Sequence, residues 1–263
     1  MGYRYLLNCL LQHETTTVMS RFPIPAPAFD GRSRTVDIGA AFEWLRLGWG
    51  TFMVNPGLWV AGALILIVGL LALCAVWLAG PLLACLLAPV VVAGLLSACR
   101  QAATEGSFAL QDLASGFRNN TTPLIMLGLV FTGAMLAINL VVFLLFSGSL
   151  AGGMMLPGVT GLGVLLGGSL LALLLSTLLL LPLGMALWFA PALVCFNNMP
   201  PLEACKASLN ACLKNILPFL ILALVVFVLT FFAALPVGLG FLVLLPVLSG
   251  VLYASYQDVF VAH

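Results

Sequence analysis

The chain has 263 residues, of which 63% are hydrophobic and only 6% are charged, and its mean hydropathy is +1.23. Soluble globular domains carry about 25% charged residues, so this composition excludes a water-soluble protein. The net charge of +1 attracts no polyanion, and no nucleic-acid partner is expected.

Residues 1–36 differ from the rest of the chain because they are more polar and contain a proline-rich stretch. Their apolar part is too short to span a bilayer, and "PIPAPAFDGRS" (23–33) is typical of an extended tether. We expect residues 1–36 to be a flexible cytoplasmic tail and residues 37–263 a single six-helix transmembrane domain. Translation starts at Met1 or, since "MSRFPIPAP" reads as a natural polar beginning, at Met19.

The remainder predicts an all-α, polytopic membrane protein. Several uncharged apolar runs have about 18 residues or more, which is enough to cross roughly 30 Å of hydrocarbon. The six predicted spans cover residues 56–78, 82–99, 123–146, 162–196, 216–235 and 237–253. Because these runs are continuous rather than alternating, they predict helices, which pair into three hairpins.

The fourth span is too long for one straight crossing. As a single helix, residues 162–196 would measure about 52 Å, so we expect a tilted helix kinked at Pro182 and at Pro191. A break into two shorter segments is the alternative. The uncharged stretch "SGSLAGGMMLPGVTG" (147–161) before it is expected to be a glycine-rich loop.

The basic residues indicate the orientation. All nine lysines and arginines precede the first span, or lie between spans two and three or between spans four and five. The positive-inside rule makes these regions cytoplasmic. With six spans, both termini are then cytoplasmic, and a bacterial inner membrane is the expected location.

A short amphipathic segment and a proline precede each predicted hairpin. The three segments are residues 37–56, 107–123 and 200–218. Such a helix cannot span the bilayer, so it is most stable in the cytoplasmic interface, with its apolar face down and its charges in water. The unit of interfacial helix plus hairpin therefore repeats three times.

Helical spacing in the third segment separates a polar from an apolar face. The polar face carries Glu203, Lys206, Asn210 and Lys214, and the apolar face carries Leu202, Cys205, Leu209, Cys212 and Ile216. The expected apolar stripe of the first segment is Ile38, Phe42, Leu45, Trp49 and Phe52. In the second segment Asp112 and Arg118 are polar and Phe117 is apolar. These polar faces are the candidate functional surface.

Polar side chains inside the spans are few, and none is charged. Asn139 lies near the middle of the third span, and Ser176 and Thr177 are among its candidate partners. Hydrogen bonding between helices, worth about 1 kcal/mol for each bond, is favoured over contact with a transported solute.

No enzyme signature emerges. His13 and His263 lie beside no nucleophile, and the acidic residues are interspersed with basic ones on amphipathic faces. The seven cysteines include no C-x-x-C pair, so no metal site and no cofactor is expected. Membrane lipids are the expected partners, with a homo-oligomer or another membrane protein left open.

The tract "WFAPALVCFNNMPPLEACKASLNACLKN" (188–215) resembles the uncharacterised YciC-like inner-membrane proteins of bacteria and, more distantly, the membrane domain of some glycerophosphodiester phosphodiesterases. The positions that carry the likeness are Pro191, Pro201, Glu203, Ala204, Lys206 and Ser208. "LQDLASGF" (110–117) and "YASYQDVF" (253–260) resemble a six-span proteobacterial family, through Asp112, Gly116, Phe117, Tyr256 and Asp258. The resemblance implies a six-span fold and transfers no activity.

Two functions fit these observations. One is a membrane scaffold or accessory factor in envelope or lipid homeostasis, acting through its interfacial helices. The other is a permease or exporter for an uncharged or lipidic solute. Internal repeats around a kinked span favour transport, and the absence of charge inside the spans favours the scaffold.

Overall fold

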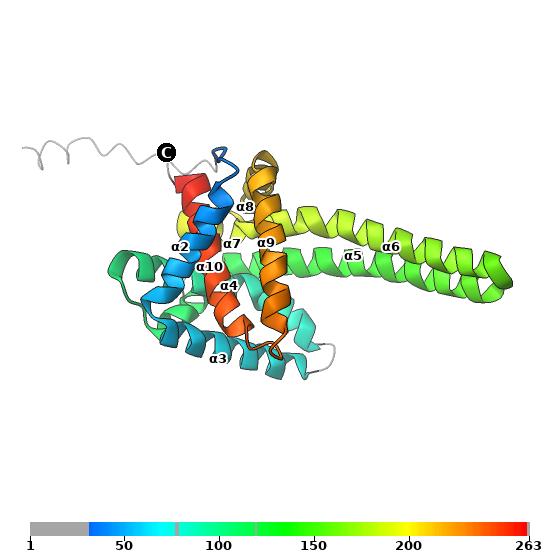
Figure 1. Cartoon of the computed structure of the whole chain (residues 1–263), viewed down its shortest axis with the longest axis horizontal. Coiled ribbons are helices and arrows are strands. Elements are labelled where there is room, and N and C mark those ends of the chain that lie inside the picture. Colours follow the sequence, from blue (N-terminus) through cyan, green and yellow to red (C-terminus); the bar gives the residue numbers. More distant parts are fainter. Residues whose placement is uncertain (1–31, 77–78, 119, 262–263) are drawn as a thin grey trace, which may run out of the picture. The chain divides into compact units, whose positions relative to one another are not determined.

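The computed structural model describes residues 32–76, 79–118 and 120–261, and this part of the chain is helical without a strand (Figure 1). The α-helices are α2 (Ala40–Val54), α3 (Pro56–Cys74), α4 (Ala79–Glu105), α5 (Thr121–Met155), α6 (Gly158–Trp188), α7 (Ala190–Asn197), α8 (Pro201–Lys214), α9 (Ile216–Ala234) and α10 (Phe241–Tyr256). A 3-10 helix, η1, covers Leu110–Phe117, and a π-helical turn covers Gln257–Val261. Most of the predicted tail, residues 1–31, lies outside the described residues.

Six helical stretches are long and apolar enough to cross a membrane, which confirms the all-α class and the number of candidate spans. They are Pro56–Cys74, Ala79–Glu105, Thr121–Met155, Gly158–Asn197, Ile216–Ala234 and Phe241–Val261. Their outward surfaces are covered by exposed leucine, valine and phenylalanine side chains. Such a surface is stable only against hydrocarbon or another apolar partner.

Prolines begin several of these helices, as the sequence predicts. Pro56 is the first residue of α3, and the side chain of Asn55 accepts a hydrogen bond from Leu58 N at 3.3 Å. Pro201 occupies the first position of α8. A proline there loses no hydrogen bond, because the first N–H groups of a helix have no partner within it.

The glycine-rich stretch 147–161 is not a loop, so that expectation is wrong. Residues up to Met155 continue α5, and α6 begins at Gly158. Small residues bring the two helices close: a Cβ added to Gly168 would lie 2.2 Å from Ser149 Cβ. In hydrocarbon, a helix satisfies its own backbone, so glycines form packing surfaces there instead of loops.

The predicted fourth span is broken into α6 and α7, which was the alternative to a kinked helix. α6 continues through Pro182 and ends at Trp188, and Pro191 lies in the first turn of α7. The Ser208 hydroxyl from α8 donates to Met185 O at 2.7 Å and accepts from Phe189 N at 3.0 Å. It thus takes the place of a helical bond, which ends α6.

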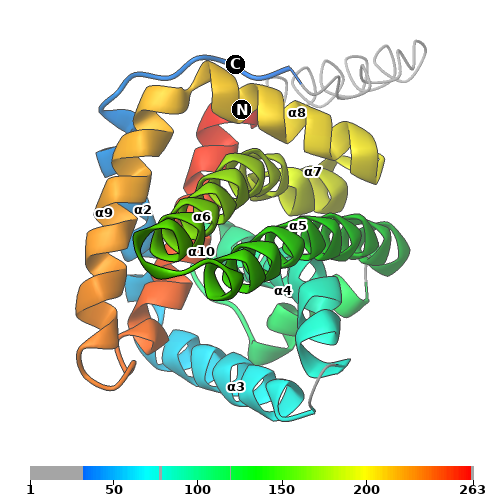
Figure 2. The same ribbon diagram turned by 90° about the vertical axis from the view of Figure 1, so that its right-hand side faces the viewer.

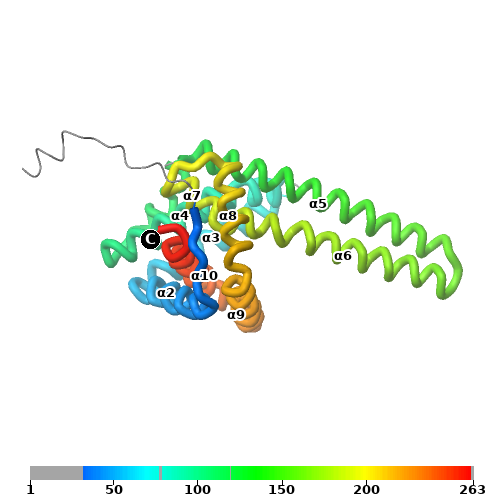
Figure 3. Tube along the Cα trace, turned by 90° about the horizontal axis from the view of Figure 1, so that it is seen from above, coloured from blue at the N-terminus to red at the C-terminus, as the bar shows by residue number. Residues whose placement is uncertain are grey.

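The three hairpins do not form one parallel bundle. α5 and α6 pack on each other and run together across the direction of α9, whereas α10 lies beside α2 (Figures 1 and 3). Spans in a bilayer usually tilt by about 20°, so this crossing is wider than a six-span bundle predicts. The crossing helices diverge from one another, which leaves α6 and α9 with few mutual contacts.

An aromatic cluster lies where α2, α9, the junction of α6 with α7 and the π-helical turn meet. Trp44 and Phe189 both pack against Phe219, with ring centroids 5.3 and 5.6 Å apart, and Phe260 packs on Phe189 at 5.2 Å. Trp44, Phe189 and Phe260 are each at most 1% exposed. This aromatic cluster fixes the helices that carry the charged residues.

α2 packs on protein through one face and exposes most of its expected apolar stripe. Its buried side is Ala41, Trp44, Gly48 and Phe52, whereas Ile38, Phe42 and Trp49 of the expected stripe are about half exposed. Gly48 and Gly250 let α2 and α10 come within van der Waals distance. A protein neighbour thus takes the small-residue face, and the large apolar side chains point outward.

Candidate functional site

The polar stripe of α8 is exposed, as predicted. Glu203, Lys206, Asn210 and Lys214 all lie on the surface, and no hydrogen bond or ion pair joins these side chains to the described residues. Glu203 lies in the first turn and Lys214 in the last, where each charge complements the helix dipole. The stripe is therefore available to water, lipid headgroups or a partner.

The face of α8 that packs on protein consists of small residues. Ala204, Ser208 and Ala211 are fully buried, and α8 packs through this face on α6 and α7 (Figure 2). Small side chains allow helices to approach closely. The resemblance already singles out Ala204 and Ser208, and the structure gives both a packing role.

A third face of α8 is apolar and exposed. Leu202 and Leu213 are 61% and 54% exposed, and Ile216, the first residue of α9, is 50% exposed. The expected apolar face is thus divided, because Cys212 is buried in the protein whereas Leu202 and Ile216 point outward. A helix with one face on protein, one charged and one leucine-rich is suited to the membrane interface.

The two cysteines of α8 are poor nucleophiles. Burial raises the pKa of the Cys212 thiol to about 12, and burial also raises the pKa of Cys205. Cys212 Sγ lies 3.5 Å from Met185 O. Because the thiolate is the reactive form, both side chains are expected to react slowly at neutral pH.

The candidate residues of η1 play local structural roles. The Asp112 carboxylate accepts a hydrogen bond from Ala109 N at 2.6 Å and so caps the start of η1. Arg118 is exposed at its end, and Phe117 is 49% exposed. The structure does not bring these three residues to the stripe of α8.

A polar junction missed in the sequence joins the N-terminal segment to two distant helices. Asn215, between α8 and α9, is 2% exposed and accepts from Val36 N at 2.8 Å. Its Nδ2 donates to Arg34 O and to Ala211 O, both at 3.0 Å. The junction thus holds residues 34–36 in place.

Asp258 extends this junction to the C-terminal end. Its carboxylate forms an ion pair with Arg34 and accepts from Trp44 Nε1 at 2.8 Å. The resemblance includes Asp258 among its positions but gives it no role. The sequence offered one signal for this junction: Arg34, Asn215 and Asp258 are all predicted on the cytoplasmic side of the membrane.

A second polar contact stabilises the turn after α7. The side chain of Asn120 donates to Asn198 Oδ1 at 2.7 Å and to Val194 O at 3.3 Å, so it satisfies a carbonyl at the end of α7. Tyr256 OH donates to Asn197 Oδ1 at 2.6 Å. These bonds link α5, α7 and α10.

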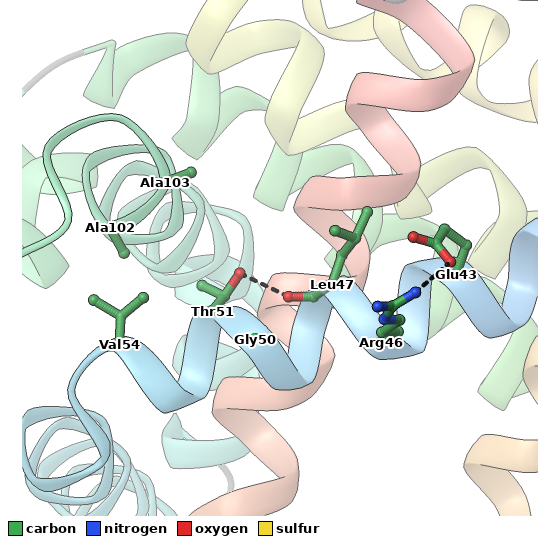
Figure 4. Close-up of a pocket in the computed structure, with 8 residues that line it drawn as sticks. All are labelled: Glu43, Arg46, Leu47, Gly50, Thr51, Val54, Ala102 and Ala103. Atoms are coloured by element: carbon green, nitrogen blue, oxygen red, sulfur yellow. Dashed lines mark hydrogen bonds and ion pairs between the residues drawn. The ribbon is translucent and has the colours of Figure 1, made fainter.

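A cleft of about 550 Å³ lies between α2 and the end of α4 (Figure 4). Its polar side chains are Glu43, Arg46 and Thr51, and Ala102 and Ala103 form the opposite wall. The Glu43 and Arg46 charges lie 4.0 Å apart, and Thr51 Oγ1 donates to Leu47 O at 3.0 Å. The cleft presents no nucleophile with an adjacent base, so no reaction is assigned to it.

The intramembrane polar candidates do not form a cluster. Asn139 is exposed on α5 and donates to Met135 O at 2.8 Å, within its own helix. Ser176 and Thr177 both donate to Leu173 O on α6, at 2.8 and 3.0 Å. The predicted hydrogen bonds between helices are therefore not formed by these three residues. In an apolar medium, such side chains bond to the preceding turn of their own helix when no neighbour reaches them.

Replacing Asn139 by leucine should leave the fold intact. The side chain contributes one hydrogen bond within its own helix, so the variant should lose no more than about 1 kcal/mol of stability. Its melting temperature in detergent should therefore stay close to that of the wild type. Thermal unfolding followed by size-exclusion chromatography measures this. A strong loss of stability would show that Asn139 has an essential partner in another helix or chain.

No metal centre is apparent in the residues described: no three His, Cys, Asp or Glu side chains come together there as ligands. His13 and His263 lie outside these residues.

Comparison with known proteins decides the broad class. The chain is 28% identical, over 227 residues, to a protein of Burkholderia thailandensis described as a probable inner membrane protein. The match covers 83% of this chain and 82% of that protein. Together with the six candidate spans, this likeness places the chain among multi-pass proteins of the inner membrane. No family model and no solved structure matches it.

Proposed function

We propose that this inner-membrane protein has no enzymatic activity and serves as a scaffold or accessory factor in envelope or lipid homeostasis. The observation that carries the proposal is α8, which exposes a charged stripe beside a leucine face and is fixed to α6 and α7 by a third face. We place this helix in the cytoplasmic interface, with both termini on the same side. Its lysines then lie among lipid headgroups, where each contributes about 1 kcal/mol with anionic lipid.

The hydroxyl and thiol chemistry supports a non-enzymatic role. The Ser208 hydroxyl is engaged with the backbone at the end of α6, and Thr51 donates within its own helix. Cys205 and Cys212 are held in the thiol form by burial. A hydrolase or transferase would need such a hydroxyl or thiol as a nucleophile. Here these groups bond to the backbone or are buried by packing.

A permease for an uncharged or lipidic solute is the second candidate. A polar cavity that reached Asn139 would favour it. The cleft beside Glu43, the cavity beside Asp258 and a third, apolar cavity lined by α6 and α9 are all formed by other residues, and Asn139 faces outward. We therefore rank the scaffold first and propose the YciC-like proteins as its relatives.

Genetic complementation tests the scaffold. A strain without the gene should show an altered membrane lipid profile, which the wild-type protein restores. The double variant Lys206→Glu, Lys214→Glu should insert at normal levels but fail to restore the profile, because its stripe repels anionic headgroups. The matched control Glu203→Gln, Asn210→Gln adds no negative charge and should restore it. An unchanged profile in the deletion strain would contradict the proposal, and a solute flux in proteoliposomes that survives the charge reversal would favour the permease.

A further inference from the structure

The hairpin of α5 and α6 is the part of the described chain that its own neighbours cover least. In the stretches Thr121–Met155 and Gly158–Asn197, 6% of the most apolar part is buried, against 17% to 56% in the other four candidate spans. Figure 1 shows the two helices extending together beyond the other helices. Most of the surface of this hairpin is therefore left for contacts from outside the chain.

One polar side chain interrupts this apolar surface at the middle of α5. Asn139 is exposed, and it lies about 24 Å from the nearer end of the 35-residue helix, at 1.5 Å per residue. Its neighbours along the helix, Leu136, Leu140 and Phe143, are exposed and apolar. In a helix that crosses roughly 30 Å of hydrocarbon, this position lies deep in the bilayer, where no water can bond to the amide.

The amide of Asn139 has bonding capacity that its own helix does not use. Its Nδ2 donates one hydrogen to Met135 O at 2.8 Å, and no other residue that the structure describes bonds to this side chain. An asparagine has two N–H donors and a carbonyl acceptor, so one N–H and Oδ1 remain. Ser176 and Thr177 differ, because each has a single donor and gives it to Leu173 O. Unpaired amide groups are costly in hydrocarbon, so a partner that reaches them stabilises the protein.

We propose that Asn139 is the centre of a twofold interface between two copies of this chain, in which each amide donates its free N–H to Oδ1 of the other. One free donor and one free acceptor make the amide complementary to itself. Copies that insert with the same orientation hold each residue at the same depth, and a twofold axis along the membrane normal brings identical residues together. A second copy thus presents the matching group at the required depth. The interface uses α5 and does not depend on the scaffold role of α8.

Helical spacing distinguishes the proposed face of α5 from the opposite one. Phe143 lies one turn beyond Asn139 on the same face and is 64% exposed. Val141 is 42% exposed but points about 200° away from Asn139, since successive residues of a helix are about 100° apart. These two positions have nearly equal depth and make a matched pair.

Oxidative cross-linking in native membranes tests where the two copies meet. In a background without the seven native cysteines, Phe143→Cys should form a disulfide-linked dimer at least tenfold faster than Val141→Cys, with a membrane-permeable oxidant such as copper phenanthroline. Both side chains are exposed, so neither substitution should unfold the chain. Equal cross-linking of the two variants would overturn the proposal. So would cross-linking of Phe143→Cys to a different protein instead of to a second copy.

Variants of Asn139 test the contribution of the amide. Energy transfer between labelled copies in liposomes, measured at decreasing protein-to-lipid ratios, gives the dissociation constant of the dimer. Asn139→Leu should raise this constant about tenfold, which corresponds to about 1.4 kcal/mol, while the melting temperature in detergent stays near that of the wild type. Asn139→Gln keeps the amide and should stay within about threefold of the wild type. A monomeric wild-type protein, or equal association of Asn139→Leu and the wild type, would contradict the proposal.

Discussion

Replacing Gly116 by valine should prevent stable folding, and alanine should already weaken the protein severely. A Cβ on Gly116 would lie 2.1 Å from Val90 O, and one on Gly94 would lie 2.0 Å from Leu113 O. Both contacts are with backbone atoms, so no side chain can move aside and η1 would have to separate from α4. We expect Gly116→Ala to cost about 3 kcal/mol or more, which is at the upper end for overpacking.

Gly133→Ala is the control for this prediction. Gly133 lies on α5, and nothing within 4 Å would meet its added Cβ. Alanine there should be neutral or should stabilise by about 0.4–1 kcal/mol, since it restricts the unfolded chain. Thermal unfolding in the same detergent compares the two variants. Equal melting temperatures would show that η1 does not pack against α4.

The second large effect is expected at Asn215. Leucine has the same branched shape but cannot replace the two part-buried hydrogen bonds to Val36 N and Arg34 O, each worth about 0.5–1.5 kcal/mol. The segment around residue 34 should then detach from the helices. Trypsin should cut after Arg34 at least tenfold faster in Asn215→Leu than in the wild type, because each 1.4 kcal/mol is about tenfold in an opening equilibrium.

Asn210→Leu, on the exposed face of α8, is the matched control and should leave the cleavage rate unchanged. Asp258→Asn should accelerate cleavage as well, because it weakens the ion pair with Arg34 and the bond from Trp44 Nε1. If Asn215→Leu is cut no faster than Asn210→Leu, the junction does not hold the N-terminal segment.

Local patterns in the sequence predicted the features that depend on local physics. Six apolar runs became six candidate spans, since length and hydropathy alone set that requirement. Pro56 and Pro201 begin helices because their backbone needs no donor there. The polar stripe of α8 follows from helical spacing and is exposed as expected.

Features that depend on distant partners could not be read from the sequence. α6 ends at Trp188 because a hydroxyl from α8, 19 residues beyond Phe189, enters its ladder of hydrogen bonds. Asn215 and Asp258 bond to residues 179 and 224 positions away. The face that α2 buries depends on its neighbour α10. The two helices pack so closely at Gly48 that a larger side chain would clash with the backbone of α10.

Thiol labelling of α8 tests the central claim, that this helix lies in the cytoplasmic interface with its charged stripe in water. In a background lacking the other five cysteines, Cys205 and Cys212 should react slowly with a water-soluble maleimide, even in inside-out vesicles. Burial raises the pKa of the Cys212 thiol to about 12, so very little of it is thiolate at neutral pH.

A cysteine introduced by Lys206→Cys or Lys214→Cys provides the contrast, because both positions are exposed and on the polar stripe. We expect fast labelling of these variants in inside-out vesicles and none in intact cells. Equal rates for Lys206→Cys and Cys212 would show that α8 is a detached, solvated segment. Fast labelling of Lys206→Cys from outside intact cells would place the helix on the opposite side of the membrane and contradict the account.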